Sequence, residues 1–139
     1  ISTFQTRNKT PQSEFDFLKI GLVPQDRSKL HKKIEIRTKE MIDKGFLEEV
    51  RGLIEKYPDL NANHNSMRCV GYRQIFNLLD KKVEKNELIE MIIIATRQLA
   101  KRQLTWMRGM NGLKIFDPFD VSQENVIKET IESFLKVNS

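Results

Sequence analysis

The chain has 139 residues, of which 39% are hydrophobic and 31% charged, and its 24 basic and 19 acidic side chains give a formal net charge of +5. This composition is typical of a globular protein, and no apolar run approaches the roughly 20 residues of a membrane-spanning helix, so neither a disordered chain nor a membrane protein is expected. The single cysteine, Cys69, excludes an internal disulfide, argues against a structural zinc site and suits a reducing cytoplasm.

The predicted elements begin with a tail and a short strand. Residues 1–13 are polar, contain Pro11 and indicate a flexible segment. Residue 1 is isoleucine, and the opening residues lack the basic and apolar parts of a secretory signal, so we expect a piece of a longer protein. The apolar run FDFLKIGLVP, which Pro24 closes, predicts a strand.

Two helices joined at a glycine come next. The first is predicted from Asp26, a typical N-cap residue, to Gly45, and the second repeats the helical spacing of apolar residues until Pro58 ends it. Glu48 and Glu49 suit the positive end of the second helix, which is a structural role. The pair predicts a helical hairpin.

The second half of the chain is also mostly helical. A polar loop, DLNANHNS, leads to MRCVGYRQIFNLLDKK, where Gly71 precedes an amphipathic helix. The longest helix is predicted from about Lys85 to Arg108, with Asn86 as a candidate cap and Gly109 as its end. A short strand, LKIFDP, and a last helix from about Ser122 to Val137 complete the chain.

The two predicted strands lie far apart in the sequence, with only helices between them. A two-stranded ribbon is marginal in water, so these strands need neighbours. Both are apolar on successive residues, which is typical of a parallel sheet with helices on both faces. We therefore expect an α-rich α/β fold, in which the two strands complete a parallel sheet whose other strands lie in a missing N-terminal half.

Helical periodicity divides the longest helix into an apolar stripe and a basic face. At about 100° per residue, one stripe holds Leu88, Met91, Ile92, Ala95, Leu99 and Trp106. A second stripe holds Arg97, Lys101, Thr105 and Arg108. The spacing predicts that Trp106 is buried beneath the cations, with Arg102 between the two stripes.

Acidic residues are absent from two segments of the chain, 60–79 and 91–116. The basic residues in these segments are Arg68, Arg73, Arg97, Lys101, Arg102, Arg108 and Lys114. Such segments favour approach to a phosphate backbone, so RCVGYR and KRQLTWMR indicate contact with RNA or DNA. A solvated basic surface is the alternative. Tyr72 either stacks on a base or packs in the fold.

The chain offers few groups for catalysis. It contains no G-x-x-x-x-G-K-[ST] and no G-x-G-x-x-G sequence. His31 and His64 stand alone and are assigned to a helix surface and a loop. Cys69 follows Arg68 but has no histidine nearby in sequence as a base, so it is interpreted as a small buried hydrophobe. We assign no catalytic residue and no metal ligand to this chain.

Two of these motifs resemble a known enzyme family. RCVGYRQ, followed by ATRQLAKRQLTWMRG, is similar to the C-terminal half of bacterial tRNA dimethylallyltransferases, also called isopentenyl-tRNA transferases. The segment LHKKIEIRTKEMIDKGFLEEVRGL extends the resemblance to roughly residues 15–118. Lys33 stands where the family often has arginine, and Thr38 where an apolar residue is usual. At Lys33 any bidentate contact of an arginine would be lost.

The resemblance implies an enzyme that moves a dimethylallyl group from its diphosphate to the N6 amine of the adenosine 3′-adjacent to the anticodon. It also implies a P-loop-like N-terminal half, which holds the diphosphate with Mg²⁺ and supplies a catalytic Asp. Residues 14–139 are then the tRNA-binding portion, cytoplasmic, monomeric and inactive alone, and a P-loop is expected upstream of Ile1. A non-enzymatic basic helical module that binds nucleic acid is one alternative, and an interaction domain is another.

The resemblance also implies binding residues for the tRNA anticodon stem-loop and for dimethylallyl diphosphate. Arg37 matches a family arginine associated with the diphosphate, or is a surface or packing residue. The segments that match the family's tRNA contacts comprise Arg68, Cys69, Val70, Gly71, Tyr72 and Arg73, and Lys101, Arg102, Gln103, Leu104, Thr105, Trp106, Met107 and Arg108.

Overall fold

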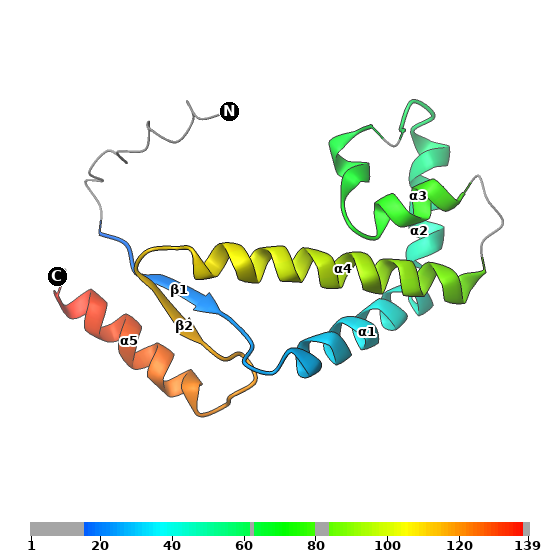
Figure 1. Ribbon diagram of the computed structural model, residues 1–139. Helices are drawn as coiled ribbons and strands as arrows, with labels where there is room; N and C mark the ends of the chain where they lie inside the picture. Colours follow the sequence, from blue (N-terminus) through cyan, green and yellow to red (C-terminus); the bar gives the residue numbers. More distant parts are fainter. Residues whose placement is uncertain (1–15, 62, 80–83, 138–139) are drawn as a thin grey trace, which may run out of the picture.

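One long helix, α4, spans the molecule, and the other elements lie along it (Figure 1). The computed structural model describes residues 16–61, 63–79 and 84–137, so the predicted segment 1–13 lies outside the described residues. The elements are β1 (Lys19–Leu22), α1 (Arg27–Asp43), α2 (Phe46–Lys56), the 3₁₀ turn η1 (Asn65–Arg68), α3 (Tyr72–Leu78), α4 (Lys85–Arg108), β2 (Leu113–Phe116) and α5 (Gln123–Val137). Within these ranges no helix is long and apolar enough to cross a membrane.

The two strands pair in parallel, as the sequence predicts. Lys19 lies opposite Leu113 and Leu22 opposite Phe116, so the strands are in register over their whole length. The pairing continues beyond β1, where the backbone N–H of Val23 donates to the Phe116 carbonyl at 2.8 Å. The pairing thus joins the segment before α1 to the segment after α4.

Most helix ends lie where the capping signals place them. The Asp26 side chain accepts a hydrogen bond from the backbone N–H of Ser28 at 2.8 Å, so α1 begins directly after its predicted cap. Gly45 has a φ of +95° and lets α2 start at once after α1. The predicted cap of α4 is wrong, because Asn86 lies inside the first turn, where the backbone is already helical, and Glu84 occupies the N-cap position without a side-chain bond.

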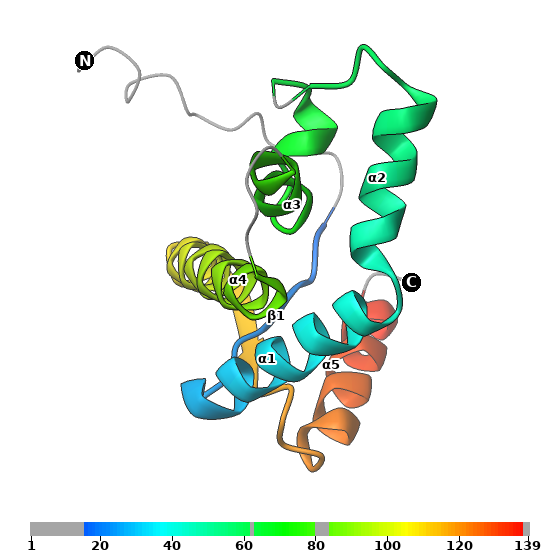
Figure 2. The same ribbon diagram turned by 90° about the vertical axis from the view of Figure 1, so that its right-hand side faces the viewer.

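Four helices meet around a small apolar core. Viewed nearly along α4, α3 lies on one side of it and α1 on another, with α2 running past them (Figure 2). The core consists of Ile42, Phe46, Val50, Ile75, Leu88 and Ile92. Thr38 is buried beside it, and its hydroxyl donates to the Ile34 carbonyl at 2.8 Å. A polar side chain therefore occupies an inward position of α1 with its donor satisfied.

The predicted burial of Trp106 is wrong, because its side chain is 74% exposed. Trp106 does share a stripe with buried Leu88, but it lies 18 positions further along α4, or about 27 Å at 1.5 Å per residue. The helices that cover Leu88 lie along the first half of α4. Near the C-terminal end the helix buries Leu104 instead, about 160° round the helix from Trp106. Helical periodicity predicts on which side of α4 the Trp106 side chain lies, but it does not predict how far along α4 the covering helices extend.

Candidate nucleic-acid interface

The two predicted basic segments meet in one hollow between α3 and α4, here named the basic groove, with a volume of about 730 Å³. Its lining residues are Arg68, Cys69, Val70, Arg73, Gln74, Ala95, Gln98, Leu99 and Arg102. The three arginines come from η1, α3 and α4, and all three are exposed. None of them makes an ion pair with an acidic residue in the described ranges. The groove therefore carries uncompensated positive charge.

A tight turn at Gly71 shapes one wall of the basic groove. Gly71 has a φ of +97°, a conformation that other residues rarely adopt, and a Cβ atom there would lie 2.9 Å from Cε1 of Phe46. Its backbone N–H donates to Oε1 of Gln74 at 2.8 Å. The turn thus needs glycine for both its backbone and its packing, and it places Arg68 and Arg73 on either side.

Tyr72 packs in the fold, which answers the question that the sequence left open. Its ring meets the Phe46 ring edge-on, with centroids 5.1 Å apart and planes at 88°. Its hydroxyl donates a hydrogen bond to the carboxylate of Glu49 on α2. That bond is the main reason why the pKa of Tyr72 is raised above its usual value, and desolvation adds to it. Tyr72 therefore connects the turn to α2.

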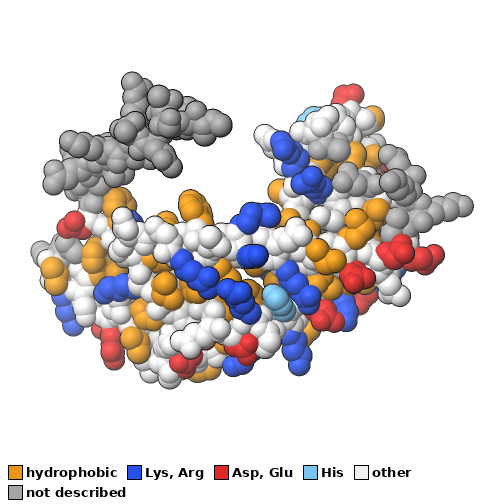
Figure 3. All heavy atoms as spheres, viewed as in Figure 1, with side chains coloured by type: hydrophobic (Ala, Val, Ile, Leu, Met, Phe, Trp, Pro, Cys, Tyr) orange, Lys and Arg blue, Asp and Glu red, His pale blue; other side chains and the backbone are white. Residues whose placement is uncertain are grey.

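A second hollow, the tryptophan hollow, lies beside the basic groove toward the C-terminal end of α4. It has a volume of about 480 Å³ and is bordered by Gln98, Lys101, Arg102, Thr105 and Trp106. Gln98 and Arg102 border both hollows, so the two lie next to each other. Figure 3 shows one face of the whole molecule, with several Lys and Arg side chains over its middle and acidic ones mainly toward its lower and right-hand edges.

Only some residues of the predicted segment 101–108 line a hollow in the structure. Lys101, Arg102, Thr105 and Trp106 line the tryptophan hollow, and the Thr105 hydroxyl donates back to the Lys101 carbonyl at 3.0 Å. The other four residues lie elsewhere on the helix: Leu104 is buried, Met107 is half-buried, and Gln103 and Arg108 are exposed but border neither hollow. Contact of all these residues with tRNA stays a prediction.

The predicted burial of Cys69 is also wrong, because its thiol is exposed and borders the basic groove. Met67, two residues earlier, occupies the buried position beside the 3₁₀ turn, and the backbone of Cys69 is extended. His31 lies exposed on α1 and His64 exposed in a loop, as predicted. Among the described residues no three His, Cys, Asp or Glu side chains gather as a metal site would require.

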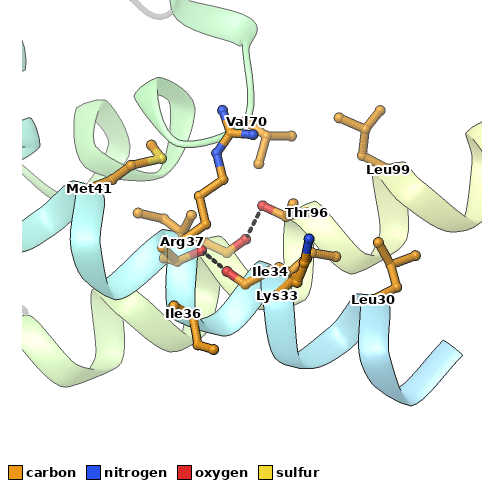
Figure 4. A pocket seen from close by; sticks show the side chains of 11 residues that line it. Leu30, Lys33, Ile34, Ile36, Arg37, Met41, Val70, Thr96 and Leu99 are labelled. Carbon is orange, nitrogen blue, oxygen red and sulfur yellow. Dashed lines mark hydrogen bonds between the residues drawn. The ribbon is translucent and has the colours of Figure 1, made fainter. Parts of the chain in front are cut away.

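The sequence analysis missed an apolar pocket of about 670 Å³ between α1 and α4 (Figure 4). Its apolar lining includes Leu30, Ile34, Met41, Val70, Ile92 and Leu99. Val70 and Leu99 also border the basic groove, so pocket and groove share a wall. The apolar residues of α1 recur at helical spacing on one face. That pattern is the same for a helix face that packs in a filled core and for one that lines a pocket. The pocket becomes evident only in the folded structure, where Val70 lies above α1 and α4.

Two cations border the apolar pocket. Arg37 extends from α1 toward Val70 (Figure 4). Lys33 lies one helical turn earlier, and its ammonium group sits 5.1 Å from the centre of the Phe119 ring, at a distance where the ring face attracts a cation. The pocket therefore combines an apolar interior with positive charge at its edge.

Comparisons with known proteins agree with this arrangement. The model of a family described as IPP transferase matches residues 1–110. A tRNA dimethylallyltransferase of Methylobacillus flagellatus is 45% identical over 121 residues, which are 87% of this chain and 38% of the relative. One of Chromobacterium violaceum is 39% identical over 138 residues, 97% of this chain and 41% of the relative. The chain thus spans about two fifths of these relatives.

Solved structures give the same result. The full-length tRNA isopentenylpyrophosphate transferase of Bacillus halodurans superposes with a TM-score of 0.74 at 27% identity, covering 92% of this chain and 43% of that one. The tRNA delta(2)-isopentenylpyrophosphate transferase of Staphylococcus epidermidis gives a TM-score of 0.77 at 25% identity, covering 91% and 40%.

Proposed function

Because this chain belongs to the IPP transferase family, we propose that it is part of a tRNA dimethylallyltransferase and supplies the surface that holds the tRNA. The complete enzyme transfers the dimethylallyl group of dimethylallyl diphosphate to the N6 amine of the adenosine 3′-adjacent to the anticodon. The chain covers 38% of one relative and 41% of another, so this activity belongs to the complete protein. We expect it to act as a cytoplasmic monomer, with no turnover by these 139 residues alone.

The observation that supports this function is the convergence of three arginines on the basic groove. Arg68, Arg73 and Arg102 come from three elements, and none of the described residues that border the groove is acidic. If the cations formed only a solvated surface, there would be no reason for arginines from three elements to line the same groove. Guanidinium groups bind phosphate oxygens in pairs, and contacts to the backbone position an RNA without reading its sequence.

The exposed Trp106 gives the same surface a flat apolar face. The target adenine must leave the base stack of the anticodon loop, which costs a few kcal/mol. Aromatic rings that stack on unpaired bases offset such a cost and are a common feature of single-stranded RNA recognition. We therefore assign Trp106 to the RNA side of the protein, rather than to the support beneath the helix.

The apolar pocket suits the other substrate. Its apolar wall matches a five-carbon dimethylallyl chain, and Lys33 and Arg37 at its edge suit the diphosphate, whose leaving requires neutralised charge. Val70 and Leu99 border both the pocket and the basic groove, so an adenine held in the groove would lie beside an allyl chain held in the pocket. The resemblance also implies Mg²⁺, a P-loop and a catalytic Asp, which we propose belong to the complete enzyme and lie outside the described residues.

A binding experiment tests this function against its alternatives. The complete protein should bind an anticodon stem-loop more tightly than an unrelated hairpin of equal charge, and the affinity should fall steeply with salt. Each phosphate contact contributes about −0.7 to −0.9 to the slope of log affinity against log salt. Equal affinity for both hairpins would favour a non-specific module. A salt-independent weak affinity would favour a protein interaction domain.

A further inference from the structure

The arginines of the basic groove stand on a short element that cannot fix its own position. α3 has seven residues, which is about half the length at which an isolated helix becomes even marginally stable. Its orientation must therefore come from contacts with other elements. Ile75 anchors the middle of α3 in the core, and further contacts at Tyr72 hold the start of the helix, next to Arg73.

Two residues of α2, Phe46 and Glu49, contact the start of α3. The Tyr72 ring packs edge-on against the Phe46 ring, and Gly71 lies close to the Phe46 ring as well. A contact between two rings depends little on direction, so α3 could still slide or tilt against α2. A hydrogen bond depends strongly on direction and restricts these movements more. The bond from the Tyr72 hydroxyl to the Glu49 carboxylate supplies the missing direction and ties α3 to α2.

From these contacts we propose that Glu49 is a positioning residue for RNA binding: through Tyr72 it fixes the turn that places Arg68 and Arg73 opposite Arg102. This rests on the proposed function, because it concerns the grip of the same groove on tRNA. Glu49 does not border the groove and touches no substrate in this role. Its carboxylate acts only by holding the hydroxyl that orients the basic segment.

Electrostatics alone predicts the opposite effect of removing this carboxylate. Glu49 is an exposed acid in the first turn of α2, and a protein that loses a negative charge should bind a polyanion more tightly. Glu48 occupies the same turn, is equally exposed and makes no bond to Tyr72. Replacement of Glu48 therefore controls for both the charge and the favourable position at the helix N-terminus.

The test measures tRNA affinity and steady-state kinetics in the complete protein, with a synthetic anticodon stem-loop as the binding probe. Glu49→Ala should weaken binding about three- to tenfold, as expected for the loss of one hydrogen bond, whereas Glu48→Ala should bind equally or more tightly. Glu49→Gln keeps an oxygen acceptor and should recover most of the affinity. Tyr72→Phe should weaken binding at least as much as Glu49→Ala, because it removes the same bond and keeps the carboxylate charge, and the double variant should be no worse than Tyr72→Phe.

Kinetics separate positioning from a general loss of structure. Glu49→Ala should raise the KM for tRNA and leave the KM for dimethylallyl diphosphate and the kcat at saturating tRNA unchanged. Unchanged or tighter RNA binding by Glu49→Ala would overturn the proposal, as would an equal rise in both KM values. Absence of stem-loop binding by the unmodified protein is a different result, because it would remove the proposed function itself and this inference with it.

Discussion

At the scale of single residues, Gly71 is a position that should not accept a side chain without loss of stability. A side chain there would be held at a φ of +97°, at a cost of about 1–3 kcal/mol, and would also press on Phe46. Gly71→Ala should therefore lower the free energy of unfolding by at least about 2 kcal/mol, measured by urea denaturation.

Gly52 provides a matched control for this prediction. It lies inside α2 with no positive φ, and a Cβ atom there would meet nothing within 4 Å. Gly52→Ala should stabilise the protein by about 0.5–1 kcal/mol, because alanine has the higher helix propensity. Equal effects of the two substitutions would contradict the turn described for Gly71.

Replacement of Trp106 should affect RNA binding but not the stability of the fold. Trp106→Ala should change the free energy of unfolding by no more than about 0.5 kcal/mol, because the side chain is 74% exposed and supports little of the fold. Binding of an anticodon stem-loop should nevertheless weaken, since a stacking face is lost. A loss of about 3–5 kcal/mol in urea denaturation, typical of a buried tryptophan, would contradict the placement.

At the scale of elements, the start of α1 should respond to pH. Hydrogen bonds from Ser28 hold the pKa of Asp26 below its usual value of 3.8. A group whose pKa is lowered in the folded state stabilises that state when ionised. Its contribution is therefore complete above pH 3.8 and is lost as the pH falls through the lowered value.

Two substitutions measure this contribution. Asp26→Ala should destabilise the protein at pH 7, and its difference from the natural protein should shrink when urea denaturation is repeated near pH 3. Asp26→Asn keeps a capping oxygen without a titrating group, so it should retain stability at pH 7 with a flatter pH dependence. An Asp26→Ala penalty of the same size at both pH values would contradict the role of the ionised cap.

The accuracy of the sequence predictions differs between elements for physical reasons. The bounds of α1, α2 and α4 follow from local chemistry, because Asp26, Gly45 and the helical periodicity act over a few residues. The turn η1 was not predicted, because four residues are too few to show a helical period. Local signals thus predicted the helices but not what packs against them.

The candidate site shows the same limit. The basic segments were identified from charge, and their meeting in one groove agrees with that interpretation. The errors at Trp106 and Cys69 arose because burial depends on partners that are distant in sequence. The apolar pocket could not be predicted at all, since α1, α4 and the loop residue Val70 must first be assembled.

At the scale of the whole molecule, RNA binding should depend on where a charge lies and not only on how many there are. Arg68→Ala and Arg102→Ala should each weaken stem-loop binding and reduce the salt slope by about 0.7–0.9, one phosphate contact each. Lys101→Ala should behave similarly in the tryptophan hollow. Lys136→Ala on α5 removes the same charge but borders none of the hollows, so its slope should stay unchanged. Equal slopes for all variants would show that only net charge matters.

The three hollows all border α4, so this helix fixes the distances between them. From Ile92 in the apolar pocket to Trp106 at the far end, the spacing is set by 14 helical steps, or about 21 Å. One residue inserted between Leu99 and Arg102 would lengthen that span by only about 1.5 Å but turn everything beyond it by about 100°. Such an insertion would therefore turn Trp106 away from its present direction relative to the apolar pocket, whereas an exchange of exposed side chains would leave the spacing of the hollows unchanged.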